Sequence, residues 1–247
     1  MERLVPWAQP LVDLRTGDPA GVELLARLEV PGHGVLEPAE FVGTVVPEVA
    51  VDRRMWWYAR RLVTAMPGLR VHVNLSAATL CDGRVLRRML RAGPEVVSRV
   101  VVEITERLPP DSVEAALLAA ESLRDAGYVL ALDDFGVGTS SLRALRRLCP
   151  CVLKLDGSFV RGVALDARAR AVVRAVAGLC RDLGCTLVAE GVETPGLLEP
   201  LRDLGVDCAQ GFAISPPVPI PLACHPRDIA LLPPLPQNGT GGTLKKT

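Results

Sequence analysis

The sequence predicts a closed (β/α)₈ barrel, a TIM-like α/β fold, built as a single domain over residues 1–225. First, its short apolar runs do not alternate with polar residues, which is typical of parallel strands buried on both faces. Second, these runs alternate with amphipathic helices, which indicates a βα series. Third, no glycine fingerprint of a dinucleotide-binding fold follows the first strand, and the length suits one barrel.

A helix–glycine–strand unit recurs three times in the second half of the chain. In each copy a helix ends at Arg-Asp, a glycine follows as a left-handed cap, and a strand begins at once. The three glycines are Gly127, Gly184 and Gly205.

The helices of these units are readable in order. Asp111 is expected to cap the first, with Glu114 three residues on as its capping-box partner. The second fills residues 166–183 and the third residues 194–204. Strands are predicted at residues 71–74, 99–105, 128–134, 151–156, 186–190 and 206–210, after an earlier strand within residues 21–30.

Composition excludes several classes of protein. The formal net charge is zero, so nothing global indicates binding of duplex nucleic acid or of an anionic membrane. The seven cysteines are an odd number in apolar segments, which fits reduced thiols in a cytoplasmic protein. Cys149 and Cys151 lack a nearby histidine, which argues against a zinc site.

The two ends of the chain predict neither export nor membrane insertion. Charged residues and Pro6 interrupt the start, so no signal peptide is visible. The longest uncharged stretch runs from Cys208 to Pro226 and carries five prolines, which a membrane helix would not tolerate. Residues 226–247 turn to proline, glycine and threonine and are expected to form a disordered tail.

Polar side chains appear where the predicted strands end. They are Asn74, Glu103, Asp133, Asp134, Lys154, Asp156, Glu190 and Gln210. Because the carboxyl ends of barrel strands meet on one rim, we expect these residues to converge there. Glu23 and Arg27 share a parity in the early strand and should face the same side of it.

Five carboxylates would therefore crowd into one small volume: Glu23, Glu103, Asp133, Asp134 and Glu190. They cannot all stay ionised without a compensating cation, and one lysine is insufficient. All-oxygen ligands suit Mg²⁺ or Mn²⁺. An adjacent Asp-Asp pair can bridge two ions, as in phosphoester hydrolysis. The alternative is that some of these acids are helix caps or exposed loop charges.

Lys154 is unusual for this chain. It is the single lysine of the first 224 residues, and arginine supplies 25 of the 28 basic residues. A position that keeps lysine against this bias is expected to need a compact ammonium. The histidines His33, His72 and His225 are expected to be structural or solvated, and they support no Ser-His-Asp set.

These motifs resemble the EAL-domain cyclic-di-GMP phosphodiesterases from about Trp7 to Pro219. The matching segments, in family order, are AQPLVDLRTG, GVELLARL, VNLS, VVEITE, LALDDFGVGTSSL, LKLDGSFV, VAEGVET and AQGF. The resemblance implies hydrolysis of cyclic-di-GMP to linear pGpG with two Mg²⁺ or Mn²⁺ ions, in a homodimer with a possible regulatory partner.

The resemblance also implies roles for individual residues. Metal ligands would be Glu23, Asn74, Glu103 and Asp133 for one ion, with Asp133 bridging to a second held by Asp134 and Glu190. Lys154, Glu190 and Gln210 would serve catalysis around the attacking water. Substrate contacts would come from Gln9, Arg27 and Asp156. Coupling of metal binding to the dimer would involve Glu106 and the loop residues Phe135, Gly136, Gly138 and Ser140.

The chain departs from the family pattern away from the metal set. The departures are Ala8, Leu28, Gly43, Val45–Pro47, Thr139 and Gly157. These departures are expected to affect the contacts with the guanine bases and the geometry of the dimer. Two other readings are a binding module that signals through a partner protein, and a different barrel hydrolase of phosphoesters.

Overall fold

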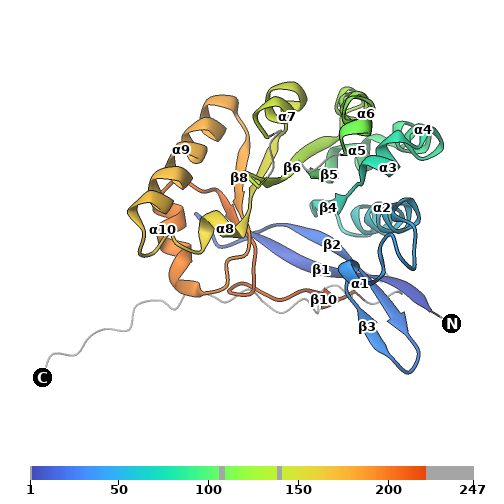
Figure 1. The fold of residues 1–247 in the computed structure, drawn as a ribbon, viewed down its shortest axis with the longest axis horizontal. Helices are drawn as coiled ribbons and strands as arrows, with labels where there is room; N and C mark the ends of the chain where they lie inside the picture. Colours follow the sequence, from blue (N-terminus) through green and yellow to red (C-terminus); the bar gives the residue numbers. More distant parts are fainter. Residues whose placement is uncertain (1, 106–108, 138–140, 221–247) are drawn as a thin grey trace, which may run out of the picture.

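The computed structural model describes residues 2–105, 109–137 and 141–220 of the 247-residue chain. Its centre is a closed barrel of eight strands, which confirms the predicted fold class (Figure 1). The strands are β1 (Arg3–Asp13), β2 (Pro19–Val30), β4 (Val71–Asn74), β5 (Val100–Thr105), β6 (Val129–Phe135), β7 (Val152–Leu155), β8 (Thr186–Ala189) and β9 (Cys208–Ala209). The predicted tail at 226–247 lies outside the described residues.

The first two strands of the barrel, β1 and β2, form an antiparallel hairpin, whereas a regular βα series would have a helix between them. β1 is antiparallel to both β2 and β9, whereas each neighbouring pair from β2 round to β9 is parallel. The Asp13 carboxylate accepts hydrogen bonds from the backbone N–H groups of Arg15 and Thr16 and closes the turn. An antiparallel pair needs only such a turn, while a parallel pair needs a crossover. Two short strands extend the sheet: β3 (Gly34–Leu36) beside β2 and β10 (Val218–Pro219) beside β1.

Helices cover the outside of the barrel (Figure 1). They are α1 (Pro38–Phe41), α2 (Glu48–Ala65), α3 (Ala77–Cys81), α4 (Gly83–Leu90), α5 (Pro94–Arg99), α6 (Val113–Asp125), α7 (Ser141–Leu148), α8 (Gly157–Val160), α9 (Ala167–Leu183) and α10 (Leu198–Asp203). The prediction for 166–183 is confirmed, with Asp166 as the cap of α9. Residues 194–204 hold a 3₁₀ turn, η2 (Pro195–Leu197), followed by α10.

The predicted cap at Asp111 is wrong. Asp111 lies inside a 3₁₀ turn, η1 (Pro110–Ser112), and α6 begins after Ser112 without a side-chain cap. A capping residue must stand outside the helical turn with an extended backbone. Because the turn precedes α6 directly, Asp111 does not occupy that position.

The interior of the barrel is built in two layers. The lower layer is a cluster of small apolar side chains: Leu11, Val101, Ala131, Val152, Val188 and Cys208. Each member of this cluster except Leu11 is followed two residues later by a polar residue of the rim. These polar residues are Glu103, Asp133, Lys154, Glu190 and Gln210. Alternate residues of a strand share a face, so the polar layer stands directly above the apolar one. A larger apolar core lies between the strands and the helices.

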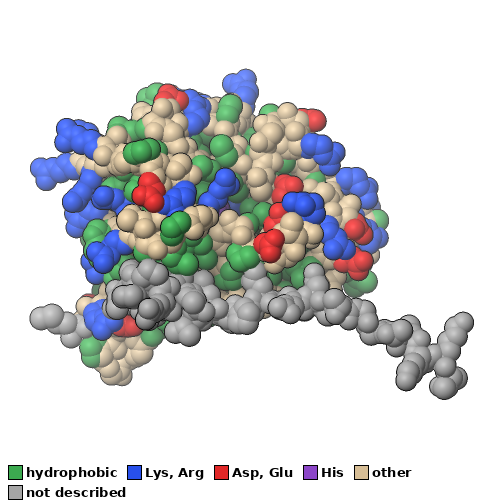
Figure 2. Space-filling view, turned by 180° about the vertical axis from the view of Figure 1, so that it is seen from behind, with side chains coloured by type: hydrophobic (Ala, Val, Ile, Leu, Met, Phe, Trp, Pro, Cys, Tyr) green, Lys and Arg blue, Asp and Glu red, His purple; other side chains and the backbone are tan. Residues whose placement is uncertain are grey.

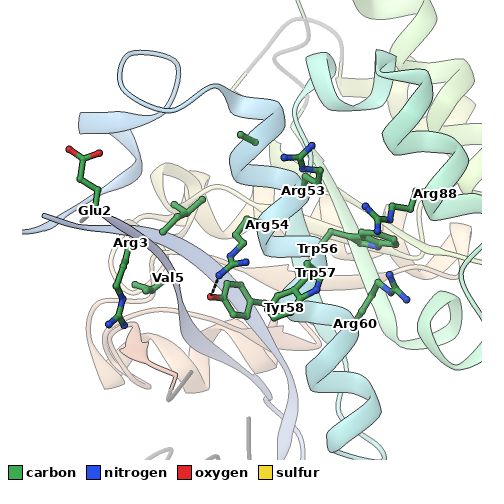
Figure 3. Close-up of a pocket in the computed structure, with 12 residues that line it drawn as sticks. Glu2, Arg3, Val5, Arg53, Arg54, Trp56, Trp57, Tyr58, Arg60 and Arg88 are labelled. Carbon is green, nitrogen blue, oxygen red and sulfur yellow. Dashed lines mark hydrogen bonds between the residues drawn. The ribbon is translucent and has the colours of Figure 1, made fainter. Parts of the chain in front are cut away.

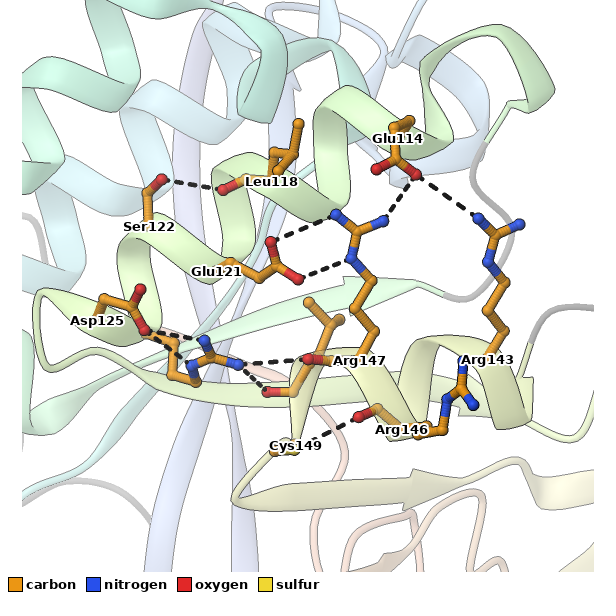
Figure 4. Close-up of polar contacts among 11 residues, drawn as sticks. Glu114, Leu118, Glu121, Ser122, Asp125, Arg143, Arg146, Arg147 and Cys149 are labelled. Atoms are coloured by element: carbon orange, nitrogen blue, oxygen red, sulfur yellow. Dashed lines mark hydrogen bonds and ion pairs between the residues drawn. The ribbon is translucent and has the colours of Figure 1, made fainter.

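Ion pairs fix α7, the helix that follows the rim end of β6, onto α6 (Figure 4). The Arg147 guanidinium lies 2.7 Å from both Glu114 and Glu121 of α6. In return, Arg124 of α6 donates to the backbone carbonyls of Arg147 and Leu148 at 3.3 Å. These contacts fix the second half of α7 against α6. Within the described part of the chain, no helix is both long and apolar enough to span a bilayer.

The three repeat glycines take positive φ values of 97°, 68° and 89° at Gly127, Gly184 and Gly205, which confirms the predicted left-handed caps. A matched pair on α9 tests this requirement. Gly184→Ala should lower the free energy of unfolding by about 1 kcal/mol, because a Cβ is strained in the left-handed region. Gly178→Ala, in the open interior of the same helix, should raise it by roughly 0.5–1 kcal/mol. Urea unfolding of both variants measures the difference, and effects of the same sign would contradict the cap assignment.

Candidate metal centre at the rim of the barrel

One lysine stands among four carboxylates at the carboxyl ends of the strands. Lys154 of β7 is 1% exposed. Its Nζ lies 2.8 Å from Glu190, 3.0 Å from Glu103 and 3.2 Å from both Glu23 and Asp133. These acids come from β2, β5, β6 and the residue after β8. The group therefore carries a formal excess of negative charge in a buried position, which a divalent cation would offset.

Three amide side chains hold Glu23 in place. Asn74 donates to one carboxylate oxygen of Glu23 at 2.7 Å, and Gln210 donates to the other at 2.7 Å. Gln210 also donates to Gln9 at 3.1 Å, and Gln9 donates to the backbone carbonyl of Ser215 at 3.1 Å. The described residues thus contain a hydrogen-bonded chain from β1 through the end of β9 to β2.

The carboxylates do not share one protonation behaviour. Burial disfavours ionisation of Glu23, but the Lys154 ammonium and the hydrogen bonds from Gln210 and Asn74 outweigh it and lower the pKa to about 2. Burial, opposed by Lys154 and reinforced by Asp133, raises the pKa of Glu190 to about 8. Burial and then the Glu23 charge raise the pKa of Glu103 well above its usual range. A bound cation would be needed for all of them to ionise together at neutral pH.

His72 is a member of the site that the sequence analysis placed only as structural or solvated. It is 4% exposed, and its Nδ1 lies 2.8 Å from Glu103. Burial, and next the Lys154 charge, lower its pKa to about 3, so the ring is neutral and its Nδ1 shares one hydrogen bond with the Glu103 carboxyl group. The signal in the sequence was its position two residues before Asn74, on the same face of β4.

Asp133 and Asp134 face the rim together although adjacent residues of a regular strand point to opposite sides. The pairing of β6 with β7 shifts between Leu132 and Phe135, and Asp134 has a φ of 55°. Positive φ is uncommon for a residue other than glycine and occurs often at functional sites. This irregularity brings carboxylate oxygens of Asp133, Asp134 and Glu190 within 4.8 Å of one another.

The donor set fits a hard divalent ion. Oδ1 of Asp133 is buried and accepts no hydrogen bond from the described residues, although Lys154 lies 3.2 Å away. Carboxylate oxygens grouped at this spacing are the ligands that Mg²⁺ and Mn²⁺ prefer. Asp133, Asp134 and Glu190 would hold one ion. Glu23, Asn74 and Glu103 lie around Lys154 next to Asp133, where the sequence analysis placed the other.

A cavity of about 330 Å³ opens over this group. Gln9, Glu23, Asp133, Asp134, Lys154, Glu190 and Gln210 line it together with the exposed Phe212. The backbone at Gly211 packs directly against that of Val192, since a Cβ at this position would lie 2.3 Å from the Val192 nitrogen. Only glycine fits there without moving the cavity wall. The sequence analysis did not single out Gly211 or Phe212, although both belong to its AQGF segment.

Two predicted substrate residues do not line this cavity. Arg27 stacks over the Trp7 ring at 5.4 Å and lies 3.4 Å from Glu37. Asp156 caps α8 by accepting a hydrogen bond from the Ser158 backbone. The departures Ala8 and Leu28 are buried in the core between strands and helices, away from the cavity lining.

The predicted coupling loop is described only at its start. Phe135 is buried, and Gly136 has a φ of 99° with a Cβ position 2.7 Å from the Phe159 ring. Glu106, Gly138, Thr139 and Ser140 lie outside the described residues. Their roles and the homodimer stay predictions.

Metal binding should strengthen as the pH rises from about 6.5 to about 8.5. Glu190 holds a proton below its pKa of about 8, and a carboxylate must lose that proton to bind a cation. Glu103 acts in the same direction, whereas Glu23 is ionised throughout. Calorimetric titration with Mn²⁺ in two buffers of different ionisation enthalpy measures both affinity and proton release. Glu190→Gln is the control and should reduce the pH dependence to the part that Glu103 contributes; a pH-independent affinity of the unmodified chain would contradict the prediction.

The chain is similar to known proteins over most of its described length. The EAL domain model matches residues 1–217. The bifunctional diguanylate cyclase/cyclic di-GMP phosphodiesterase MucR of Pseudomonas aeruginosa is 35% identical over 235 residues, covering 88% of this chain and 33% of MucR. The chain spans only part of the length of the curated relatives it matches, for example 31%, 26% and 33% of three of them.

Solved structures agree with this relationship. An EAL domain protein from Listeria monocytogenes superposes with a TM-score of 0.79 at 28% identity, covering 87% of this chain and 89% of that chain. The manganese/cyclic-di-GMP complex of Klebsiella pneumoniae BlrP1 gives 0.75 at 29%, covering 87% and 56%. With the barrel, the rim carboxylates and the family model all in agreement, the chain belongs to the EAL domain family.

Proposed function

We propose that this domain is a phosphodiesterase that hydrolyses cyclic-di-GMP to linear pGpG with Mg²⁺ or Mn²⁺, two ions per site. The observation that carries the proposal is the rim itself. The carboxylates of Glu23, Asp133, Asp134 and Glu190, the Lys154 ammonium and the Gln210 amide line one cavity, and Glu103 and Asn74 contact Lys154 and Glu23 of this group. Related proteins whose names state this activity or this ligand support the choice of substrate.

The metal ligands would be Asp133, Asp134 and Glu190 for one ion and Glu23, Asn74, Glu103 and Asp133 for the other. Bound divalent ions would neutralise the phosphodiester and act as Lewis acids toward its oxygens. His72 would keep Glu103 oriented through its 2.8 Å hydrogen bond, which is how residues behind a ligand tune a metal site.

Lys154 acts in this proposal as a fixed ammonium donor. Burial opposes its charge, but Glu103, Glu190 and Glu23 outweigh burial and raise its pKa well above the usual range. A charged lysine would orient the attacking water through its N–H donors. In the overall reaction the water oxygen bonds to phosphorus, the ester P–O bond breaks, and the leaving hydroxyl gains a proton. Gln210, in contact with Glu23, would position the same water.

The exposed ring of Phe212 gives the cavity an apolar edge for a purine base. Its side chain is 69% exposed at the mouth, two residues after Gln210. Aromatic rings stack on bases without selecting a sequence. Because Arg27 and Asp156 do not line the cavity, this edge and Gln9 would carry much of the contact with the guanines.

Incubation of the purified chain with cyclic-di-GMP and Mn²⁺ or Mg²⁺, followed by chromatography, tests the proposal. Linear pGpG should appear, and EDTA should abolish it. Asp133→Asn should reduce turnover by at least ~100-fold, because it removes a charge shared by both proposed ions. Asp182→Asn, at an exposed position on α9, is the matched control and should leave turnover unchanged. Intact cyclic-di-GMP with measurable binding would instead support the binding module, and turnover of other phosphodiesters alone would support a different barrel hydrolase.

The role of Lys154 is tested by Lys154→Arg. The ammonium lies within 3.2 Å of four carboxylates and is 1% exposed, so a larger planar head does not fit without moving a ligand. We expect most ligand binding to persist and kcat to fall by at least ~100-fold at saturating metal. Calorimetry and turnover measurements separate the two effects. An arginine variant within a few-fold of the unmodified rate would show that charge alone suffices.

A further inference from the structure

A second cavity lies away from the rim. It has a volume of about 470 Å³ and shares no lining residue with the cavity over the carboxylates. Its walls come from α2, from the start of β1 and from α4, and Figure 3 shows arginine side chains from all three elements around it. The residues that matter below are Arg3, Arg53, Arg54, Arg60, Arg88 and Trp57.

Positive charge is concentrated on this side of the molecule. Five arginines line the cavity, against the single glutamate Glu2. Figure 2 shows Lys and Arg side chains gathered along the edge that carries α2 and α4, at the left of that view. A chain with zero formal net charge therefore keeps a strongly basic hollow, which attracts anions.

Most of these arginines have no acidic partner. Arg3 pairs with Glu29, but no ion pair to Arg53, Arg60 or Arg88 occurs among the residues that the structure describes. Nε of Arg60 is buried and has no hydrogen-bond partner there. Two nearby acids have other hydrogen-bond partners: Asp52 accepts hydrogen bonds from Ser76 and Thr79, and Asp82 caps α4, where its charge also interacts with that of Arg53 from beyond ion-pair distance.

Aromatic rings restrain the guanidinium groups of two arginines that line the hollow, Arg54 and Arg60, and of the neighbouring Arg61. Arg54 lies 4.9 Å from the Trp57 centroid and 4.8 Å from that of Tyr58, and it donates to the Tyr58 hydroxyl at 3.0 Å. Arg61 packs on Trp57 at 4.8 Å from the next turn of α2, and Arg60 lies 4.8 Å from the Trp56 ring. Cation–π contacts of this kind restrain arginine without using its N–H edges.

From these observations we infer that this hollow, the arginine hollow, is a binding site for a polyphosphate group, as carried by a nucleoside triphosphate or by inorganic polyphosphate. Restrained guanidinium forks match phosphate oxygens bidentately. The ring of Trp57 already packs against the guanidinium groups of Arg54 and Arg61, one helical turn before and after it. The ring is therefore not free to stack on a ligand, and the N–H groups of the arginines would bind the phosphate oxygens. A cavity of this size accommodates a ligand the size of a mononucleotide.

Tripolyphosphate is the probe that tests the inference. Trp56 and Trp57 line the hollow and are two of the three tryptophans of the chain, so intrinsic fluorescence reports binding there. Titration of the whole chain at about 50 mM salt should give saturable binding that weakens as salt rises. Calorimetry gives the affinity independently. Absence of binding at this salt would overturn the inference.

Matched charge-removing pairs locate the site. Arg53→Gln with Arg88→Gln removes two exposed side chains from two helices and should weaken binding by about tenfold or more. Arg168→Gln with Arg174→Gln removes the same charge from the exposed side of α9 and should change affinity by less than about twofold. Equal losses in both pairs would show diffuse attraction and overturn the site.

Two further measurements identify which chemical feature of the ligand is recognised. Arg53→Lys with Arg88→Lys keeps the charge but removes the planar fork, so affinity should still fall; full affinity would overturn fork recognition. GTP binding as tightly as tripolyphosphate supports recognition of the phosphate chain alone, and tighter GTP binding supports a nucleotide as its source. If an oligothymidylate without a terminal polyphosphate binds more tightly than either, the surface binds nucleic acid and the inference is wrong.

Discussion

The attraction between one buried ammonium and four carboxylates is the interaction on which the rim of this barrel depends. Lys154 reaches oxygens from β2, β5, β6 and the end of β8 at 2.8–3.2 Å, so a single side chain ties opposite walls together. Charges buried in this way stabilise a fold only when they are matched closely. The amides of Asn74 and Gln210 and the imidazole of His72 satisfy further oxygens of Glu23 and Glu103 and keep that match in place.

The same arrangement makes the site responsive to cations. Part of the acidic charge is suppressed by protonation of Glu190 and Glu103, whose pKa values are raised chiefly by burial. Divalent ions bound at the proposed site would take the place of these protons, so the charge of the rim would depend on both pH and metal concentration.

The sequence predicted the barrel and the convergence of its polar residues because both follow from strand periodicity. Asn74, Glu103, Lys154 and Gln210 mark the places where buried strands turn polar, and a closed sheet must bring such places together. What periodicity cannot supply is local backbone irregularity. The joint orientation of Asp133 and Asp134 depends on a φ of 55° and a register shift, neither of which leaves a periodic signal.

The remaining differences have equally local causes. Parity predicted the face of β2 on which Arg27 lies but not its stacking on Trp7, nor the capping of α8 by Asp156, and the substrate contacts of both residues stay predictions. The hairpin that reverses β1 is encoded by a few turn residues around Gly17, which a search for helices and parallel strands passes over. His72 was hidden because its partner, Glu103, lies 31 residues away in the sequence.

The apolar layer beneath the charged one limits how deep the cavity at the rim can be. Leu11, Val101, Ala131, Val152, Val188 and Cys208 pack together in the barrel interior, so the cavity over the carboxylates lies above filled space and not above a channel. In the proposed reaction, substrate and product would therefore share the space above the carboxylates, and the product would compete there with the next substrate.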